Sequence, residues 1–436
     1  MGAVYVIYNL LLAVALLASA PYWFVRLLRQ GKYREGVGNR LGMLPPHLRS
    51  MVAAGKPVIW VHAVSVGEIL AVAGLIEEMR KRFAGYAIAI STTTSTGHKL
   101  AGDRFGPENV FYFPLDLSFA VRRYMRLLRP KLVVIAETEF WPNFLRAARR
   151  SGAAVAVVNA RISDRSYPRY RRFSSLLRMV LRNVDRFLAQ TEEDARRLVG
   201  VGAAQDRVMT AGNLKFDAAA PATMPEVGQL LARLQEISAG PIVVLGSTVE
   251  SEEQMLVATL RAILGRHSRA LVILAPRHKE RFDAVAELLS SYGIPFTRRS
   301  YPEWPRNVTS GSILLLDTIG ELASIYSLAY VSFVGGSLAS RGGHNILEPA
   351  AFGIPIIVGP HTENFRDIVQ KIADGGGVLV VRDQHELQSA LLRLLADPVE
   401  RKQLGERALE ILKANQGATE RTLAELEKLL LAGRTN

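Results

Sequence analysis

Short apolar runs, glycine-containing turns and amphipathic helical patterns alternate along the chain from about residue 57 onward. The first series of apolar runs lies at 57–62, 86–91, 110–113, 132–136, 153–159 and 186–189, with helical patterns between the runs, as over residues 69–83. A second series lies at 241–246, 270–275, 312–316, 328–334 and 354–358. Short apolar runs alternating with helices are typical of buried parallel strands. The pattern therefore predicts two doubly wound α/β domains.

The N-terminal segment has a different pattern, because residues 4–25 carry no charge. About 20 such residues suffice to cross a bilayer, and basic residues follow, so we predict an anchor helix over residues 1–25 with the rest of the chain in the cytoplasm. A cleaved signal peptide, suggested by Ala18-Ser19-Ala20, and a core helix are the alternatives. The basic segment 26–40 would lie against anionic headgroups or serve as a solvated linker. Its cations are Arg26, Arg29, Lys32, Arg34 and Arg40.

The domain boundaries follow from composition. A chain of 436 residues is too long for one ordinary core. Residues 218–227 contain two prolines among small residues, which is typical of a linker. We therefore expect an N-terminal domain over 26–217 and a second domain over 228–417. An amphipathic C-terminal helix over 418–436 follows the second domain.

The charge of the chain narrows the class of its partners. The formal net charge is +14, and the chain has no cysteine, so disulfides and thiolate metal sites are excluded. Residues 122–182 hold fifteen Lys and Arg against three acidic residues. Such a surface calls for an acidic partner. No nucleic-acid-binding spacing is present, so we expect no nucleic acid and favour an anionic membrane surface or a phosphorylated substrate.

Residues 331–365 contain the most informative turn. A buried apolar run ends at Gly335 and Gly336, and a second glycine pair leads to Asn345 and Glu348. Glycines before a helix start leave backbone N–H groups free to bind phosphate or carboxylate, and Glu348 is placed to accept from ribose hydroxyls. A plain strand-to-helix turn is the alternative. The spacing does not match the dinucleotide pattern G-x-G-x-x-G.

Two acidic positions follow strands of the first series. Glu68 comes just after a strand at a predicted helix start, where it could take a proton from an attacking hydroxyl. With Ser65 it also completes the capping-box pattern S-x-x-E, which is the structural alternative. Glu137 and Glu139 lie at another strand end. One of this pair is expected to be structural and the other to position an acceptor.

Two cations are candidates for the stabilisation of a leaving phosphate. Lys215 lies near the predicted domain junction, and Arg277 follows a strand of the second series. A solvated surface cation is the alternative. The histidines His62, His278 and His344 have no metal-ligand spacing, so we expect no metal site.

Several blocks in the chain resemble the Kdo (3-deoxy-D-manno-octulosonic acid) transferase family of lipopolysaccharide synthesis. They occur in family order over nearly the whole chain, and the predicted anchor also matches. The blocks are 60–68 (WVHAVSVGE), 137–143 (ETEFWPN), 159–163 (NARIS), 212–215 (GNLK), 275–278 (APRH), 335–338 (GGSL), 342–349 (GGHNILEP) and 359–360 (GP).

The resemblance implies a GT-B fold, in which two Rossmann-like domains face a cleft. The implied reaction transfers Kdo from CMP-Kdo to the 6'-hydroxyl of lipid IVA, with inversion and without a metal or cofactor, at the inner membrane. Glu68 would be the general base, and Glu137 and Arg161 would bind the acceptor. The donor-binding residues would be Lys215, Arg277, His278, Gly335, Gly336, Ser337, Asn345 and Glu348.

The resemblance has one departure and leaves some questions open. The block expected as a Gly-Ser-Thr-His-like turn has Val249 in its fourth position, so any role of that position is in doubt. Alternatives are a GT-B enzyme that uses a UDP-sugar, or a membrane-surface scaffold without activity. The number of Kdo units transferred, the oligomeric state, and whether the N-terminal helix spans the membrane or lies in its interface stay open.

Overall fold

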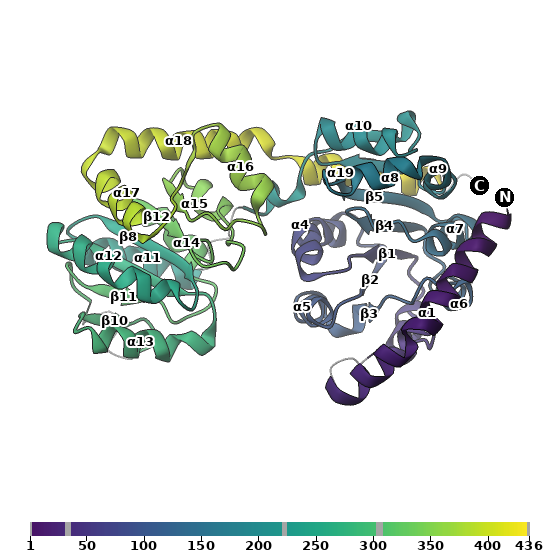
Figure 1. Ribbon diagram of the computed structural model, residues 1–436, viewed down its shortest axis with the longest axis horizontal. Coiled ribbons are helices and arrows are strands. Elements are labelled where there is room, and N and C mark those ends of the chain that lie inside the picture. Colours follow the sequence, from purple (N-terminus) through teal and green to yellow (C-terminus); the bar gives the residue numbers. More distant parts are fainter. Residues whose placement is uncertain (1, 31–35, 220–224, 302–307, 434–436) are drawn as a thin grey trace. The chain divides into compact units, whose positions relative to one another are not determined.

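The computed structural model describes residues 2–30, 36–219, 225–301 and 308–433. The chain forms two compact units. Unit 1 consists of Met1–Ala218 together with Gln416–Asn436, and unit 2 consists of Ala219–Asn415. The division falls within the predicted linker 218–227, of which residues 220–224 lie outside the described residues. Each unit is described by itself (Figure 1).

Unit 1 is built on a seven-stranded parallel sheet with the strand order β3-β2-β1-β4-β5-β6-β7. Every residue of β1 and β4 is buried, because helices cover both faces of the sheet. The fully buried Trp60 of β1 packs edge-on against Phe144, with 4.8 Å between ring centroids. The strands are β1 (Val58–His62), β2 (Ala87–Thr92), β3 (Val110–Tyr112), β4 (Leu132–Ala136), β5 (Ala154–Ala160), β6 (Arg186–Ala189) and β7 (Val208–Thr210).

The helices of unit 1 form two layers. One core cluster joins α6, α7, α9 and α10 to one face of the sheet, and another joins α4, α5 and α19 to the opposite face. Thr94 and Thr191 begin α5 and α10 by accepting from backbone N–H groups in the first turn. The helices are α1 (Gly2–Gln30), α2 (Val37–Arg40), α3 (Pro46–Ala53), α4 (Val66–Arg82), α5 (Ser95–Phe105), α6 (Ser118–Leu128), α7 (Pro142–Arg150), α8 (Tyr167–Arg172), α9 (Ser174–Leu181), α10 (Glu192–Gly200) and α19 (Ala418–Ala432).

The C-terminal helix α19 belongs to unit 1, although it follows unit 2 in the chain. Its apolar face packs beside α4 against the sheet. Arg82 of α4 pairs with Glu420 and Glu427, and Arg186 pairs with Glu425 at 3.0 Å. Of the predicted helix over 418–436, the structure shows Ala418–Ala432, which covers part of one face of the first sheet, and residues 434–436 lie outside the described residues.

Unit 2 repeats the plan with a second seven-stranded parallel sheet. Its strand order is β10-β11-β9-β8-β12-β13-β14. The strands are β8 (Ile242–Thr248), β9 (Leu271–Pro276), β10 (Phe296–Arg298), β11 (Ile313–Leu315), β12 (Val331–Val334), β13 (Ile356–Val358) and β14 (Val378–Val380). Together with unit 1, this confirms the prediction of two doubly wound α/β domains.

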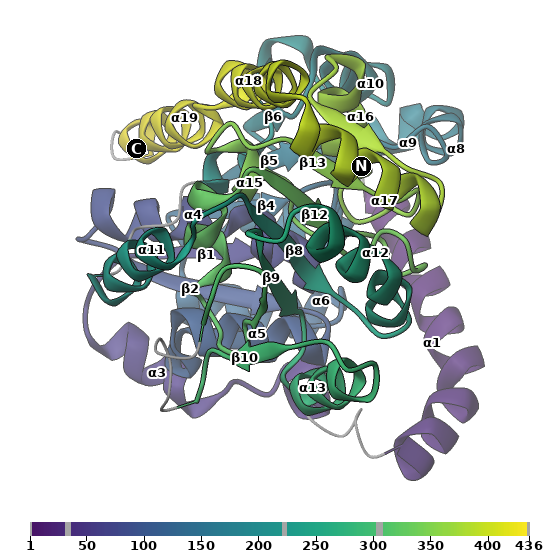
Figure 2. The same ribbon diagram turned by 90° about the vertical axis from the view of Figure 1, so that its left-hand side faces the viewer.

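The helices α12, α13 and α17 bury their apolar residues on one face of the second sheet, and Figure 2 shows them on the same side. Asp383 begins α17 by accepting from the N–H groups of His385 and Glu386. The helices of unit 2 are α11 (Pro225–Ile237), α12 (Glu252–Arg266), α13 (Phe282–Ser291), α14 (Leu322–Ile325), α15 (Leu347–Ala350), α16 (Arg366–Asp374), α17 (Gln384–Ala396) and α18 (Pro398–Asn415).

The N-terminal helix α1 requires a correction. In the parts of the chain that the structure describes, no helix combines the length and the apolar character that crossing a bilayer requires. The predicted membrane-spanning anchor over 1–25 is therefore not supported. The helix is present, but polar side chains on one side of it bind unit 1: Tyr8 donates to Asp116 at 2.9 Å, and Asn9 exchanges hydrogen bonds with Asn143. Residues 31–35 of the predicted basic segment lie outside the described residues.

Candidate active site

The order of strands reverses at one point in each sheet, between β1 and β4 in unit 1 and between β8 and β12 in unit 2. Ligands of doubly wound sheets bind beyond the carboxyl ends of the strands at such a point. The predicted residues Glu68 and Glu137 follow β1 and β4, and the glycine pair Gly335 and Gly336 follows β12. The sequence therefore places candidate residues at the expected edge of both sheets.

Glu68 lies in the first turn of α4, and its side chain is buried. One carboxylate oxygen accepts from the backbone N–H of Val64 at 2.8 Å, and the other accepts from the Ser65 hydroxyl at 3.2 Å. The Ser65 side chain makes no capping bond to the helix, and the N–H that Glu68 accepts from belongs to Val64 and not to the N-cap residue Ser65, so the capping box is not formed. The carboxylate thus keeps unused lone pairs, which an attacking hydroxyl can use.

Two further carboxylates act on Glu68. Burial raises the pKa of Glu68 from its usual 4.5 to about 7, the hydrogen bond from Val64 opposes this rise, and the negative charges of Glu139 and Glu137 add to it. Burial, followed by the charge of Glu137, also raises the pKa of Glu139. The two acids of the ETEFWPN block therefore act electrostatically on Glu68. A pKa near neutrality suits a general base.

Two residues at this edge have a left-handed backbone. Glu137, directly after β4, has φ 54°, and Asn159, near the end of β5, has φ 53°. Such conformations are uncommon outside glycine and cluster at functional sites. The Asn159 side-chain oxygen accepts from the backbone N–H of Leu214, so it holds the turn that carries Lys215. Lys215 therefore lies in unit 1, in the 3-10 helix Leu214–Ala219.

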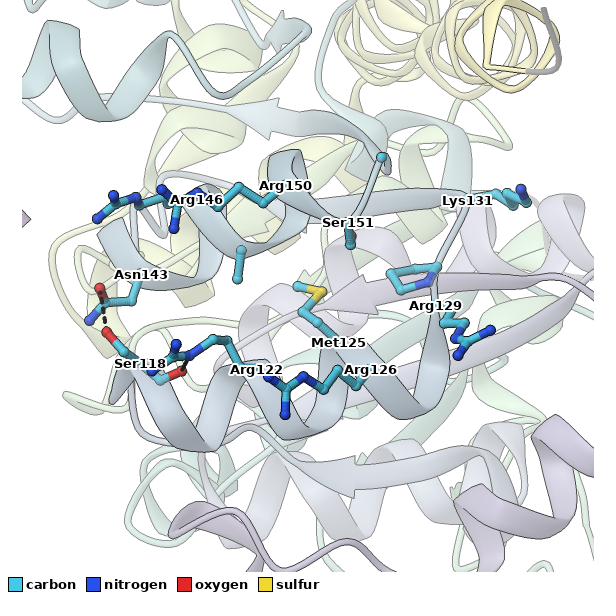
Figure 3. A pocket seen from close by; sticks show the side chains of 13 residues that line it. Ser118, Arg122, Met125, Arg126, Arg129, Lys131, Asn143, Arg146, Arg150 and Ser151 are labelled. Carbon is cyan, nitrogen blue, oxygen red and sulfur yellow. Dashed lines mark hydrogen bonds between the residues drawn. The ribbon is translucent and has the colours of Figure 1, made fainter. Parts of the chain in front are cut away.

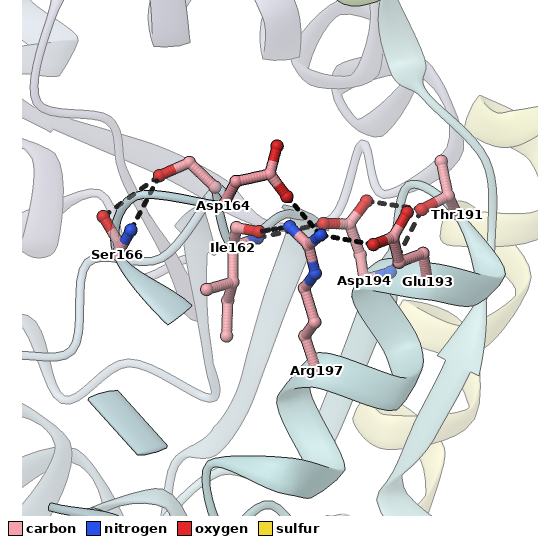
Figure 4. A network of polar contacts seen from close by, with 8 residues as sticks. Ile162, Asp164, Ser166, Thr191, Glu193, Asp194 and Arg197 are labelled. Carbon is pink, nitrogen blue, oxygen red and sulfur yellow. Dashed lines mark hydrogen bonds and ion pairs between the residues drawn. The ribbon is translucent and has the colours of Figure 1, made fainter. Parts of the chain in front are cut away.

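A polar network fixes the loop that contains Arg161, directly after β5 (Figure 4). Arg197 of α10 donates to the carbonyl of Ile162 at 2.6 Å and pairs with Asp164 and Glu193. The backbone N–H of Ile162 donates in turn to Asp194 at 3.0 Å. The loop that carries the predicted acceptor-binding Arg161 is thereby tied to a rigid helix.

In unit 2, the loop at Gly335 and Gly336 was expected to offer free backbone N–H groups to an anion, and the structure differs. Its N–H groups are not free: the carboxylate of Glu252, in the first turn of α12, accepts from Gly336 at 2.7 Å, from Leu338 at 2.7 Å and from Ala339 at 3.1 Å. Glu252 is fully buried. A Cβ on Gly335 would lie 2.8 Å from this carboxylate, so the glycine is needed for the close approach. The predicted anion site at these N–H groups is therefore wrong, because an anion of the chain already fills it.

Other groups around the glycine loop also have partners within the protein. The Ser337 hydroxyl is buried and accepts from the N–H of Gly359 at 2.8 Å, so it joins two loops. The backbone N–H of Val249 donates to Glu252 at 3.2 Å. Position 249, which differs from the family pattern, therefore contributes through its backbone. The helix after the loop, α15, has only four residues, so it offers little of the expected positive helix end.

Arg277, Asn345 and Glu348 do come together. The Asn345 amide donates to Glu348 at 3.1 Å. Burial raises the pKa of the Glu348 carboxyl, whereas the Asn345 amide and the charge of Arg277 lower it. A half-buried carboxylate beside an amide and a guanidinium is equipped to bind hydroxyls and a phosphate. These three residues form the part of unit 2 best suited to a sugar nucleotide.

The histidines have distinct environments. The imidazole ring of His344 lies against Gly336. A Cβ placed on Gly336 would be only 2.7 Å from this ring. Burial lowers the pKa of His344 to about 4, and the charges of Arg277 and His278 lower it further. His62 is fully buried and stacked on Phe113, with 3.8 Å between ring centroids, and burial lowers its pKa to about 3. His62 is therefore a core residue, whereas His278 and His344 lie with Arg277.

Two sets of residues result. Glu68, Glu137 and Glu139 gather in unit 1, and Arg277, His278, His344, Asn345 and Glu348 gather in unit 2. The predicted cleft between the domains stays a prediction. Sequence reasoning missed Glu252, although its position one turn after the central strand β8 matches that of Glu68 after β1.

Comparison with known proteins gives one consistent family. The family described as 3-Deoxy-D-manno-octulosonic-acid transferase (kdotransferase) matches residues 35–218. The 3-deoxy-D-manno-octulosonic acid transferase of Haemophilus influenzae is 34% identical over 418 residues, covering 93% of this chain and 95% of that protein. The enzyme of the same name from Bordetella pertussis is 37% identical over 388 residues, covering 85% and 87%.

Solved structures with low sequence identity share the fold. A putative UDP-N-acetylglucosamine 2-epimerase from Listeria monocytogenes has a TM-score of 0.55 at 12% identity, covering 85% of this chain and 96% of that chain. MurG from Acinetobacter baumannii has a TM-score of 0.52 at 16% identity, covering 86% and 99%. The expectation of two Rossmann-like domains of the GT-B class is thereby confirmed.

Proposed function

The chain belongs to the 3-deoxy-D-manno-octulosonic acid (Kdo) transferase family and is a glycosyltransferase, and we propose that it transfers Kdo from CMP-Kdo to the 6'-hydroxyl of lipid IVA. Family membership supports Kdo transfer in lipopolysaccharide synthesis. The hydroxyl that is attacked, the acceptor and the roles of individual residues are the proposal. The observation that carries it is the geometry of Glu68.

Glu68 is suited to be the general base for three reasons. Its carboxylate lies at the switch point of the acceptor-side sheet, it keeps lone pairs unused, and its pKa is raised to about 7. A base whose pKa lies near the working pH both accepts a proton readily and is ionised in a useful fraction of molecules. Glu137 and Glu139 contribute by keeping this pKa high, because a second negative charge nearby disfavours ionisation.

In the proposed reaction, Glu68 takes the proton of the acceptor 6'-hydroxyl. The hydroxyl oxygen forms a bond to the anomeric carbon of Kdo from the face opposite the leaving group, so the configuration inverts. The bond between that carbon and the phosphate oxygen of CMP breaks, and CMP leaves with the electron pair. Each atom and charge is then accounted for without a further reactant.

The donor would be held by unit 2. Glu348 would accept from the ribose hydroxyls, with Asn345 keeping its carboxylate in place at 3.1 Å. Arg277, whose charge acts on Glu348 and His344, would stabilise the phosphate of the departing CMP. The glycine loop would contribute close backbone approach through Gly335, while Glu252 keeps its shape.

A direct assay tests the proposal. Purified full-length chain is incubated with CMP-Kdo and lipid IVA, and the product is weighed by mass spectrometry. We expect the acceptor to gain one or more Kdo residues and CMP to be released. Competitive inhibition by UDP but not by CMP would instead favour a UDP-sugar enzyme. Binding of the acceptor without release of CMP would indicate a scaffold.

We also propose that the protein works at the cytoplasmic side of the inner membrane, because the proposed acceptor is a membrane lipid. Cell fractionation tests the location. Recovery in the inner-membrane fraction, released by high salt or alkaline buffer, is the expected result. Recovery only in the soluble fraction at physiological salt would contradict it.

A further inference from the structure

A basic groove lies between α6 and α7 on unit 1 (Figure 3). Glu68, Glu137 and Glu139 are not among the residues that line it. The cavity has a volume of about 650 Å³. Six cationic side chains line it, and no acidic residue does. They are Arg122 and Arg126 of α6, Arg129 and Lys131 of the following turn, and Arg146 and Arg150 of α7.

The six cations have no acidic partner in the part of the chain that the structure describes. Among the described residues, no carboxylate lies within ion-pair distance of any of them, whereas Arg149 on the same helix α7 pairs with Asp185 at 2.7 Å. Arg122 donates to the backbone carbonyl of Ser118. Like charges in one groove repel each other, and field lines from such a concave surface concentrate anions there. An anionic ligand would offset this repulsion.

Helix α1 contacts residues that line the groove. Its Asn9 accepts from the Ser118 hydroxyl at 3.1 Å, and the guanidinium of Arg146 lies over the Tyr5 ring at 4.1 Å. Figure 1 shows α1 running alongside α6 and α7. The opposite side of α1 carries a stripe of aliphatic side chains that are 56–74% exposed. They are Val6, Ile7, Leu10, Leu11, Val14 and Leu17.

We propose that this groove binds the phosphate headgroup of an anionic membrane lipid, while the lipid chains contact the apolar stripe of α1. The two features match the two ends of such a lipid. Guanidinium groups bind phosphate oxygens in pairs, and an exposed aliphatic stripe beside cations is typical of a helix that lies in a membrane interface. The cationic turn Arg129–Lys131 precedes β4, so this end of the groove is at the edge of the sheet opposite to Glu137.

The first experiment compares two double variants that remove equal charge. R126A/R150A removes cations of the groove, and the control R171A/R172A removes two exposed cations of α8. Sedimentation with vesicles of phosphatidylcholine containing phosphatidylglycerol measures binding of the full-length chain. We expect about tenfold or greater weakening for R126A/R150A and much less for the control. Equal weakening of both variants would overturn the proposal, because it would indicate a diffuse charge effect.

A second arm separates a membrane lipid from a free phosphate ester. L10Q/L11Q alters the exposed stripe of α1 without touching the groove. We expect it to weaken vesicle binding severalfold while leaving competition by soluble glycerol 1-phosphate unchanged. Unchanged vesicle binding in L10Q/L11Q would overturn the lipid as the ligand and leave a site for soluble phosphate.

A third arm separates the groove from the transfer reaction. Turnover of CMP-Kdo with acceptor presented in detergent is measured for R126A/R150A. We expect kcat to stay within about twofold of the unaltered chain, since the groove cations touch none of the candidate active-site residues. A large loss of kcat in detergent would assign the groove to the acceptor and overturn a separate lipid site. Failure of the unaltered chain to turn over would count against the proposed function, and the vesicle arms would stand.

Discussion

Glu68 and Glu252 occupy equivalent places in the two units. Each lies in the first turn of the helix that follows the first strand of its sheet, and each of those strands borders the switch point. Yet their surroundings differ. Glu68 accepts one backbone N–H and one hydroxyl, whereas Glu252 accepts four backbone N–H groups, from Val249, Gly336, Leu338 and Ala339.

The difference shows that the position of a carboxylate in the fold does not decide its function. The number of donors that neighbouring loops supply does. With four N–H partners, the Glu252 carboxylate has its lone pairs engaged and serves as a fixed brace for the glycine loop. With two partners, Glu68 retains basicity, and burial beside two other acids raises its pKa. Substitutions of acidic residues and the pH dependence of transfer can break or sharpen this comparison.

Glu68→Gln should give the largest change. The amide cannot act as a base, so kcat should fall about 10²- to 10⁴-fold. The amide oxygen can still accept from Val64 and its NH₂ can donate to Ser65, so folding and CMP binding should be unchanged. Transfer is measured with CMP-Kdo and lipid IVA, and folding by thermal unfolding. Turnover close to that of the unaltered chain would refute Glu68 as the base.

Glu252→Gln should act on stability and donor binding instead. Whichever way the amide is turned, one of its two groups donates, so two of the four N–H groups lose their acceptor. Each unsatisfied buried donor costs about 1–3 kcal/mol, so we expect a loss of about 2–5 kcal/mol in the free energy of unfolding and a raised KM for CMP-Kdo. Denaturant unfolding and kinetics measure these.

Glu250→Gln is the matched control for Glu252→Gln, because the Glu250 carboxylate is largely exposed and lies 3.7 Å from Arg281. Exposed pairs of this kind contribute little to stability. Its stability should stay close to that of the unaltered chain. If Glu252→Gln is no less stable than Glu250→Gln, the brace assigned to Glu252 is wrong.

The strands and the N-terminal helix show how much of the fold could be predicted from the sequence. The main strands were readable, because apolar runs such as 132–136 and 186–189 have no other plausible role. The edge strands β7, β10 and β14 were not predicted, since each has only three residues and is partly exposed. The membrane-spanning anchor is not supported, and a count of apolar residues does not reveal that the polar groups of Tyr8 and Asn9 bind unit 1.

The candidate site was predictable where chemistry is local and not where it depends on distant contacts. Asn345 and Glu348 are three residues apart in the chain, so both were named from one motif, and the structure joins them by a hydrogen bond. The capping of Gly336 by Glu252 joins residues 84 positions apart, and no local pattern reveals it. The effect of Glu139 on Glu68 is likewise a property of two strand ends that meet only in the folded sheet.

The pH dependence of transfer should reflect the raised pKa of Glu68. A base must be ionised, so kcat/KM should be constant well above pH 7 and fall about tenfold for each unit below it. The acidic limb should have its midpoint near pH 7. An acidic limb centred near 4.5, the usual carboxyl value, would show that burial and neighbouring acids do not tune Glu68. Glu252→Gln should leave this midpoint unchanged, because Glu252 takes no part in proton transfer.

Glu139→Gln should have a smaller effect than the changes above, and it addresses the cause of the raised pKa of Glu68. Removing the charge of Glu139 removes one of the interactions that disfavour ionisation of Glu68, so the pKa of Glu68 should fall and the acidic limb should move to lower pH by a fraction of a unit. Glu137→Gln should move it less, because the charge of Glu139 has the larger influence. Burial of Glu68 is the leading cause of its raised pKa and is untouched by either change, so the midpoint should stay above 4.5 in both. A shift to higher pH would mean that Glu139 stabilises the ionised base, and the three acids would then have to be linked through a shared proton.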